Sequence, residues 1–123
     1  KEIYKTAPTG TVVISDIQTK GRGKGDRTWF STLGGIYFSI LLKPNKLIYS
    51  KLSTIPLLTS VVICETLKEL NFDCYIKWPN DILINGKKIC GILTEIDVKE
   101  NKINYTVIGI GINVNNEIND EIK

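Results

Sequence analysis

The chain has 123 residues, enough for one domain with one hydrophobic core, and its 42% hydrophobic and 24% charged residues exclude a disordered or fibrous protein. A net charge of +3 is far from the dense basic surface of nucleic-acid-binding proteins, so nucleic acid is not an expected partner. No apolar run approaches the roughly 20 residues that span a bilayer, and we therefore expect a cytoplasmic protein without a membrane partner.

The first third of the chain predicts two strands separated by a long loop. Residues 1–10 contain Pro8 and Gly10 and should end in a turn. Residues 11–16 are β-branched and mostly apolar, which predicts a buried strand, and residues 36–42 predict a second core strand. Two strands that hold both ends of a glycine-rich segment form a scaffold for a binding loop.

A helix is predicted at about residues 54–70. Ser53 or Thr54 can cap it, and its first turn tolerates Pro56. Apolar residues recur at helical spacing and should face the core rather than a cofactor groove. They are Leu57, Leu58, Val61, Val62, Cys64, Leu67 and Leu70.

The second half of the chain predicts strands. Residues 74–78 form a short strand that ends at a proline, and Asn85-Gly86 predicts a hairpin with a type I′ turn between residues 82–84 and 87–89. Because side chains alternate, Lys87 and Lys88 face opposite sides of the sheet. The strand should continue to about residue 98, and residues 103–114 form a last long strand before a polar tail that is expected to fray.

Residues 21–29 form the most unusual stretch, with three glycines and three cations. Glycine backbone lets successive N–H groups converge on an anion, and Arg22, Lys24 and Arg27 would add positive charge. The alternative is a solvated basic loop. A second polar stretch at residues 77–81, followed by Lys88 and Gly91, favours a site for two negatively charged groups side by side.

Histidine is absent, which excludes Ser-His-Asp and Cys-His catalysis. The three cysteines are odd in number and flanked by apolar residues, so we expect buried free thiols and neither a disulfide framework nor a zinc site. Chemistry in this chain would depend on cations, carboxylates, backbone dipoles or a metal ion.

Four stretches resemble, in the same order, the central blocks of biotin protein ligases. They are Gln-x-x-Gly-Arg-Gly at residues 18–23 with Arg27-x-Trp29, Lys-Trp-Pro-Asn-Asp at 77–81, Lys-Ile-Cys-Gly-Ile-Leu-Thr-Glu at 88–95, and Gly-Ile-Gly-Ile-Asn-Val-Asn at 109–115. The resemblance implies an α/β (α+β) fold with a mixed, largely antiparallel sheet and flanking helices, similar to lipoate ligases and class II aminoacyl-tRNA synthetase cores. It also implies that ATP and Mg²⁺ are used to convert biotin to biotinyl-5′-AMP, which then modifies a lysine of a carboxylase's biotin carboxyl carrier domain.

The resemblance also implies roles for individual residues. Lys88 matches the family's essential lysine, which bridges the biotin carboxylate and the α-phosphate, and should therefore lie beside the loop at residues 21–29. Arg22 is the second catalytic candidate. Biotin or adenylate binding is implied for Gln18, Gly21, Arg22, Gly23, Lys24, Arg27, Trp29, Lys88, Gly91, Gly109 and Gly111, and ATP and Mg²⁺ binding for Asn80, Asp81 and Asn113, with Asp81 as the metal ligand.

The reaction agrees with these residue types. A carboxylate must approach an α-phosphate, and two unit charges about 4 Å apart repel by about 4 kcal/mol at an effective dielectric of 20. A cation fixed between them removes that repulsion, and each preorganised donor is worth about 10²–10³ in rate. Because a carboxylate is already a nucleophile, the absence of histidine is compatible with this chemistry.

The chain also departs from the family. Lys24 stands where many members have arginine, so the reactive adenylate could be retained less well. The family's Ser-Thr-Asn block and its C-terminal barrel are missing, which predicts that residues 1–123 form a single, partial catalytic domain. A lipoate-type acyl ligase of the same fold and a non-catalytic ligand- or phosphate-binding module are the alternatives. The sequence leaves a homodimer open.

Overall fold

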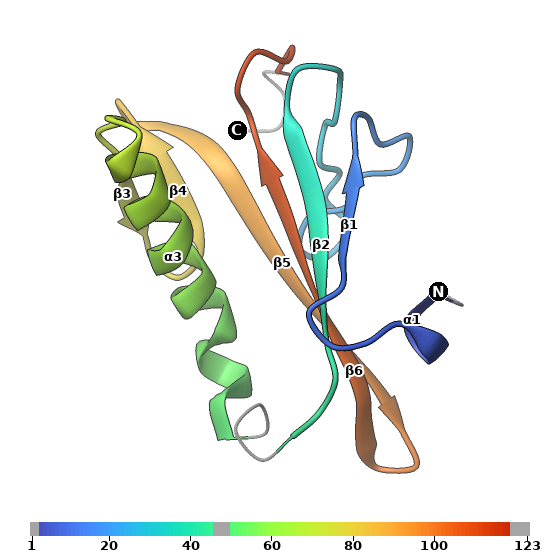
Figure 1. The fold of residues 1–123 in the computed structure, drawn as a ribbon. Coiled ribbons are helices and arrows are strands. Elements are labelled where there is room, and N and C mark those ends of the chain that lie inside the picture. The colour runs from blue at the N-terminus through green and yellow to red at the C-terminus, as the bar shows by residue number, and fades with distance from the viewer. Residues whose placement is uncertain (1–2, 46–49, 119–123) are drawn as a thin grey trace.

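The computed structural model describes residues 3–45 and 50–118 (Figure 1). Six strands form one sheet in the order β1-β2-β6-β5-β4-β3, and all the described pairings are antiparallel. The elements are α1 (Ile3–Thr6), β1 (Val12–Ser15), β2 (Ile36–Leu42), η1 (Leu52–Thr54), α3 (Ile55–Glu69), β3 (Tyr75–Lys77), β4 (Asp81–Ile84), β5 (Lys87–Lys99) and β6 (Lys102–Ile112). This arrangement confirms the predicted fold class and each predicted strand and helix to within two residues. The last part of the predicted frayed tail, residues 119–123, lies outside the described residues.

The hairpins follow from local turn chemistry. Asn85 and Gly86 have φ angles of 51° and 76°, which is the positive pair that a type I′ turn requires. The turn between β5 and β6 also has positive φ angles, 53° at Glu100 and 59° at Asn101. The first turn places β4 beside β5, and the second places the long strands β5 and β6 side by side at the centre of the sheet. None of the helices in the described ranges is long and apolar enough to cross a membrane.

The hydrophobic core lies between α3 and one face of the sheet. Cys90 and Ile92 of β5 and Ile108 and Ile110 of β6 point to this face, where they join buried side chains of α3. Alternation sends the intervening residues of both strands to the opposite face. We call the side covered by α3 the helix face and the opposite side the loop face.

The prediction that residues 11–16 form a buried strand is wrong with respect to burial. All four residues of β1 are exposed, including Ile14 at 72% of its surface. The cause is the position of the strand, because β1 lies at the edge of the sheet and pairs with β2 alone among the described strands. Its β-branched residues therefore form an edge strand rather than a buried one.

The prediction that the apolar stripe of α3 is core is only partly right. Cys64 is buried, but four members of the stripe, Leu58, Val61, Val62 and Leu70, are exposed. Figure 1 shows α3 close to β3 and β4 at one end and farther from β2 and β6 at the other. A cavity of about 500 Å³ separates helix and sheet there, and its lining is almost entirely apolar. Leu58 and Val62 face this cavity. The buried residues of α3 also include Ile55, Ser60 and Ile63, which the predicted stripe leaves out, so helical spacing identified the inward face only in part.

Candidate active site

A β-bulge directs Lys88 to the loop face. Ile82 pairs with Cys90, but the next residue of β4, Leu83, pairs with Lys88, so Ile89 is an extra residue on β5. Without the extra residue, Lys88 would share the helix face with Cys90. Bulges beside functional sites commonly re-aim a side chain in this way. Sequence reasoning placed Lys87 and Lys88 on opposite faces, and the bulge decides which of the two points toward the loop.

Lys88 lies between an acidic and an aromatic side chain. Its Nζ is 2.9 Å from Oδ1 of Asp81, and it stands 5.5 Å from the centre of the Trp29 ring. Asp81 begins β4, whereas Trp29 ends the glycine-rich loop. The expected proximity of Lys88 to residues 21–29 is therefore confirmed.

The indole of Trp29 lies against glycines of the two central strands. Gly91 and Gly111 are paired in register. A Cβ added to Gly91 would lie 2.8 Å from Cζ3 of Trp29, and a Cβ added to Gly111 would lie 2.3 Å from its Nε1. The ring of Trp29 thus covers the surface at Gly91 and Gly111, two positions for which the resemblance implies biotin or adenylate binding. Nε1 of Trp29 is buried and has no hydrogen-bond partner among the described residues. Gly109 differs, because a Cβ there would meet its nearest atom at an ordinary 3.5 Å.

The loop itself forms a small two-stranded ladder. Arg22 and Thr28 form an isolated β-bridge, the N–H of Gly23 donates to the carbonyl of Arg27 at 2.8 Å, and the N–H of Trp29 donates to Gly21 at 2.9 Å. These two N–H groups are therefore used within the loop. The cationic side chains of the loop, including Arg22, stay exposed along the ladder.

Gln18 and Gly21 meet at the base of the loop. Oε1 of Gln18 accepts a hydrogen bond from Oγ of Ser31 at 2.8 Å, and a Cβ on Gly21 would lie 2.9 Å from the same oxygen. Ser31 is buried and also donates to the carbonyl of Trp29 at 3.0 Å. Sequence reasoning missed Ser31, because nothing in the local pattern distinguishes it from an ordinary loop serine.

Arg22 forms an ion pair with Glu95, at 2.7 Å between its Nη2 and Oε1. Glu95 is on the loop face of β5, because side chains alternate along a strand and Glu95 follows Gly91 by four residues. Glu95 belongs to one of the stretches that resemble the family, but the resemblance implied no role for it. Both predicted catalytic cations therefore face a carboxylate: Lys88 faces Asp81, and Arg22 faces Glu95. Lys24 and Arg27 are exposed and have no ion pair with any residue in the described ranges.

The two asparagines predicted to lie near ATP flank the same end of β5. Nδ2 of Asn80 donates to the carbonyl of Ile92 at 2.8 Å, which attaches the turn before β4 to β5. The N–H of Asn113 donates to the bulged Ile89 at 2.7 Å. Oδ1 of Asn113 accepts from Asn116 at 2.9 Å, a contact that the sequence gave no reason to expect. Of these three residues, Asp81 contacts Lys88 directly, whereas Asn80 and Asn113 bind β5 at Ile92 and at Ile89, the neighbour of Lys88.

The geometry suits the binding of anions. Two cations on one face of the sheet are each held by a carboxylate, and both are partly exposed, with Lys88 at 40% and Arg22 at 65% of the side-chain surface. An incoming anion can replace a carboxylate as the partner of each cation. Within residues 3–45 and 50–118, no three His, Cys, Asp or Glu side chains are grouped as a metal site.

Comparisons with known proteins identify the family of the chain. The model of the Biotin/lipoate A/B protein ligase family matches residues 2–113. The bifunctional ligase/repressor BirA of Bacillus subtilis is 46% identical over 116 residues, which cover 93% of this chain and 35% of BirA. Biotin protein ligase 1, chloroplastic, of Arabidopsis thaliana is 34% identical over 120 residues, 92% of this chain and 32% of that protein.

Solved structures give the same result. The biotin protein ligase of Aquifex aeolicus in complex with biotin and ATP superposes with a TM-score of 0.82 at 36% identity, over 98% of this chain and 50% of that one. The Leishmania major enzyme in complex with biotinyl-5-AMP gives a TM-score of 0.73 at 28% identity, over 92% and 50%. The chain thus spans about a third of these curated relatives and half of these solved ones. Because the family model covers most of its length, the chain belongs to the biotin/lipoate A/B protein ligase family.

Proposed function

We propose that this chain takes part in the ATP-dependent activation of biotin to biotinyl-5′-AMP and in the transfer of biotin to a lysine of a biotin carboxyl carrier domain. The observation that carries the proposal is the position of Lys88, which the bulge turns toward Trp29 and Asp81 on the loop face. The proposal is supported by relatives that are named biotin ligases and by solved relatives in complex with biotin and ATP or with biotinyl-5-AMP.

In the first step, a carboxylate oxygen of biotin forms a bond to the α-phosphorus of ATP, and the bond to pyrophosphate breaks. The two reactants are both anionic, so they repel until a cation lies between them. The Lys88 ammonium, released from Asp81, would donate hydrogen bonds to both. Because its carboxylate partner holds it on the sheet in advance, little reorganisation is needed when charge develops on the phosphate.

Arg22 and Trp29 would confine the ligand. Arg22 belongs to the ladder of the loop and is fixed to β5 through Glu95, so it offers a second cation on the same face as Lys88. The Nε1 donor of Trp29 is buried and has no hydrogen-bond partner in the part of the chain that the structure describes, and a ligand acceptor could satisfy it. In the second step, the amine of the carrier lysine attacks the carbonyl carbon of biotinyl-5′-AMP, and AMP leaves.

Magnesium fits this site only together with a nucleotide. Asp81 is a partly buried carboxylate whose Oδ1 is already shared with Lys88, and it belongs to no group of three or more His, Cys, Asp or Glu side chains among the described residues. Mg²⁺ commonly uses one or two carboxylates together with substrate phosphates. Asp81 would hold the ion, which when bound neutralises phosphate charge and favours departure of pyrophosphate.

The finer features stay proposals. We infer that residues 1–123 belong to one catalytic domain. A carrier domain as partner follows from the proposed activity, and we also propose a cytoplasmic location. The described structure leaves the homodimer open.

The test is biotin-dependent release of pyrophosphate from ATP, measured beside calorimetric titration with biotin and then ATP. We expect biotin, but not lipoate, to support both binding and release. Lipoate-dependent release would favour the lipoate-type ligase of the same fold. Binding of phosphate or ATP without any effect of biotin would favour a non-catalytic binding module.

A further inference from the structure

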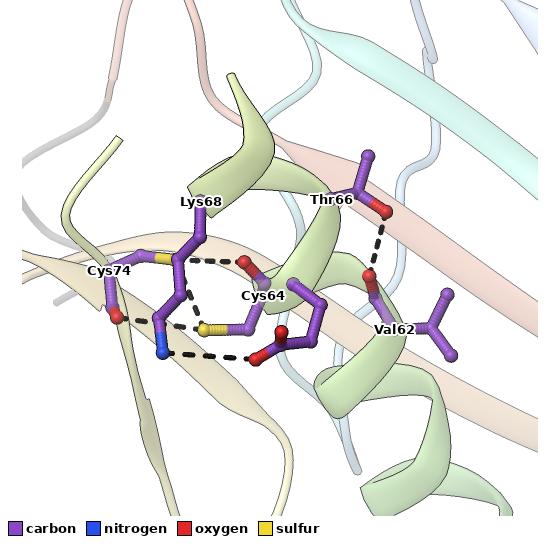
Figure 2. Close-up of polar contacts among 6 residues, drawn as sticks. Val62, Cys64, Thr66, Lys68 and Cys74 are labelled. Atoms are coloured by element: carbon purple, nitrogen blue, oxygen red, sulfur yellow. Dashed lines mark hydrogen bonds and ion pairs between the residues drawn. The ribbon is translucent and has the colours of Figure 1, made fainter. Parts of the chain in front are cut away.

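Two of the three cysteines form a close pair in the structure. Cys64, in α3, and Cys74, just before β3, are both buried, and their Sγ atoms are 3.1 Å apart. Figure 2 shows the two side chains pointing toward each other, with Lys68 beside them. The pairing is reciprocal, because each Sγ also contacts the partner's carbonyl oxygen, at 3.6 Å and 3.4 Å. Both cysteines are reduced in this structure.

We propose that Cys64 and Cys74 are a dithiol that oxidises to an intramolecular disulfide, which links α3 to β3. A disulfide requires two sulfurs about 2.05 Å apart, so these atoms would need to approach by only about 1 Å. The third cysteine does not share this geometry. Cys90 is fully buried in β5, and among the described residues its Sγ hydrogen-bonds only to the carbonyl of Gly91, at 3.8 Å. Cys90 therefore serves as an internal control.

The oxidation is a two-electron exchange. With glutathione disulfide as the oxidant, the thiolate of one cysteine attacks a glutathione sulfur, and one glutathione thiolate leaves. The second cysteine loses its proton and displaces the remaining glutathione, which forms the Cys64–Cys74 bond. Two protein S–H bonds are lost, one S–S bond is formed, and the glutathione disulfide is reduced to two thiols.

The surroundings set the rate of this reaction. Burial raises the pKa of the Cys74 thiol to about 11, the contact with Cys64 adds to the rise, and the positive charge of Lys68 opposes it. The thiolate is therefore scarce at neutral pH, and oxidation should be slow there and faster in alkali. The pair lies near the end of α3, where Lys68, Leu70 and Phe72 are exposed. Because helix ends open locally, this position provides access for an oxidant.

The bond would also be close to the candidate active site. Lys77, the last residue of β3, is paired with Asp81, the partner of Lys88. A link between Cys74 and α3 would therefore fix the strand that leads into the segment at residues 78–81. This inference does not depend on the proposed ligase activity.

Peptide mapping tests the proposal directly. The full chain is treated with glutathione disulfide at about pH 9, free thiols are blocked, and trypsin is added. Cleavage after Lys68 places Cys64 in peptide 52–68 and Cys74 in peptide 69–77, while Cys90 lies in peptide 89–99. We expect peptides 52–68 and 69–77 to be linked, with a mass two hydrogen atoms lower than the sum of the free peptides. Peptide 89–99 should carry a blocked thiol. Absence of that pair, or a link that includes 89–99, overturns the proposal.

Variants and unfolding provide the controls. Cys90→Ser should keep the linked pair, whereas Cys64→Ser should lose it; a linked product of peptide 69–77 in Cys64→Ser would contradict the assignment. Because Cys64→Ser could affect folding, the wild-type chain is also melted in both redox states. We expect the oxidised form to melt several degrees higher and dithiothreitol to reverse the change. A lower midpoint on oxidation would mean that the native geometry does not accommodate the bond.

Discussion

The ammonium of Lys88 and the carboxylate of Asp81 are 2.9 Å apart on the loop face of the sheet, beside the ring of Trp29. Both side chains are partly exposed, so as a surface ion pair they contribute little to stability, on the order of 0–1 kcal/mol. The position of this pair matters more than its stability. In the proposed function, Asp81 would hold the Lys88 ammonium at a fixed point until an anionic ligand replaces the carboxylate, and substitution of either residue tests this exchange.

Lys88→Ala should abolish adenylate formation while leaving the fold intact. The bridging cation is lost, which we expect to lower the rate of biotin-dependent pyrophosphate release by about 10²–10³ or more. Substitution of a partly exposed side chain usually changes stability by within about 0.5 kcal/mol. Lys87→Ala is the matched control, because Lys87 is the exposed neighbour at the other side of the strand. Equal activity of the two variants would contradict the role of Lys88.

Asp81→Asn separates two roles of the carboxylate. If Asp81 holds magnesium with the nucleotide, the variant needs more Mg²⁺ for half-maximal pyrophosphate release, and biotin affinity in the absence of ATP changes little. The physical reason is that the amide keeps the shape of the side chain but loses the charge that attracts a hard cation. A rate that stays low at saturating Mg²⁺, together with weaker biotin binding, would instead mean that Asp81 acts by positioning Lys88.

Local features of the structure could be predicted from the sequence. The Asn85-Gly86 turn needs two positive φ angles, which these residue types adopt readily, and the observed angles agree. The helix at residues 55–69 and the strands follow from periodicity, and the motif blocks identified the family before any geometry was known.

Long-range relationships could not be predicted. The burial of β1 depends on the order of strands in the sheet, and its edge position leaves Ile14 exposed. The bulge at Ile89 has no local sequence signal, although it decides which lysine faces the site. The position of the Trp29 ring could not be predicted either, because its contacts with Gly91 and Gly111 join segments that are more than sixty residues apart in the sequence.

Gly111→Ala should displace Trp29 and weaken biotin binding. A methyl group at this position would overlap the indole at 2.3 Å, so the ring must move or the strand must shift, at a cost of about 1–3 kcal/mol. Gly109→Ala is the steric control for stability on the same strand, because its added Cβ meets nothing closer than 3.5 Å. Chemical denaturation compares the two variants, and biotin titration compares Gly111→Ala with the wild-type chain. A Gly111→Ala protein as stable as Gly109→Ala, with wild-type biotin affinity, would exclude the close contact in solution.

Lys24→Arg should improve retention of the adenylate. Lys24 is exposed on the loop and makes no ion pair within the described ranges, and an ammonium is a point charge without the two-pronged donor geometry of a guanidinium. Since an arginine can hold a phosphate through two parallel hydrogen bonds, the variant should release less biotinyl-5′-AMP into solution. The measurement is the amount of biotin attached to lysines of a bystander protein. Lys87→Arg is the control, because it makes the same lysine-to-arginine change outside the loop. If the wild-type chain modifies only its carrier, the adenylate does not escape, and the lysine at position 24 carries no penalty.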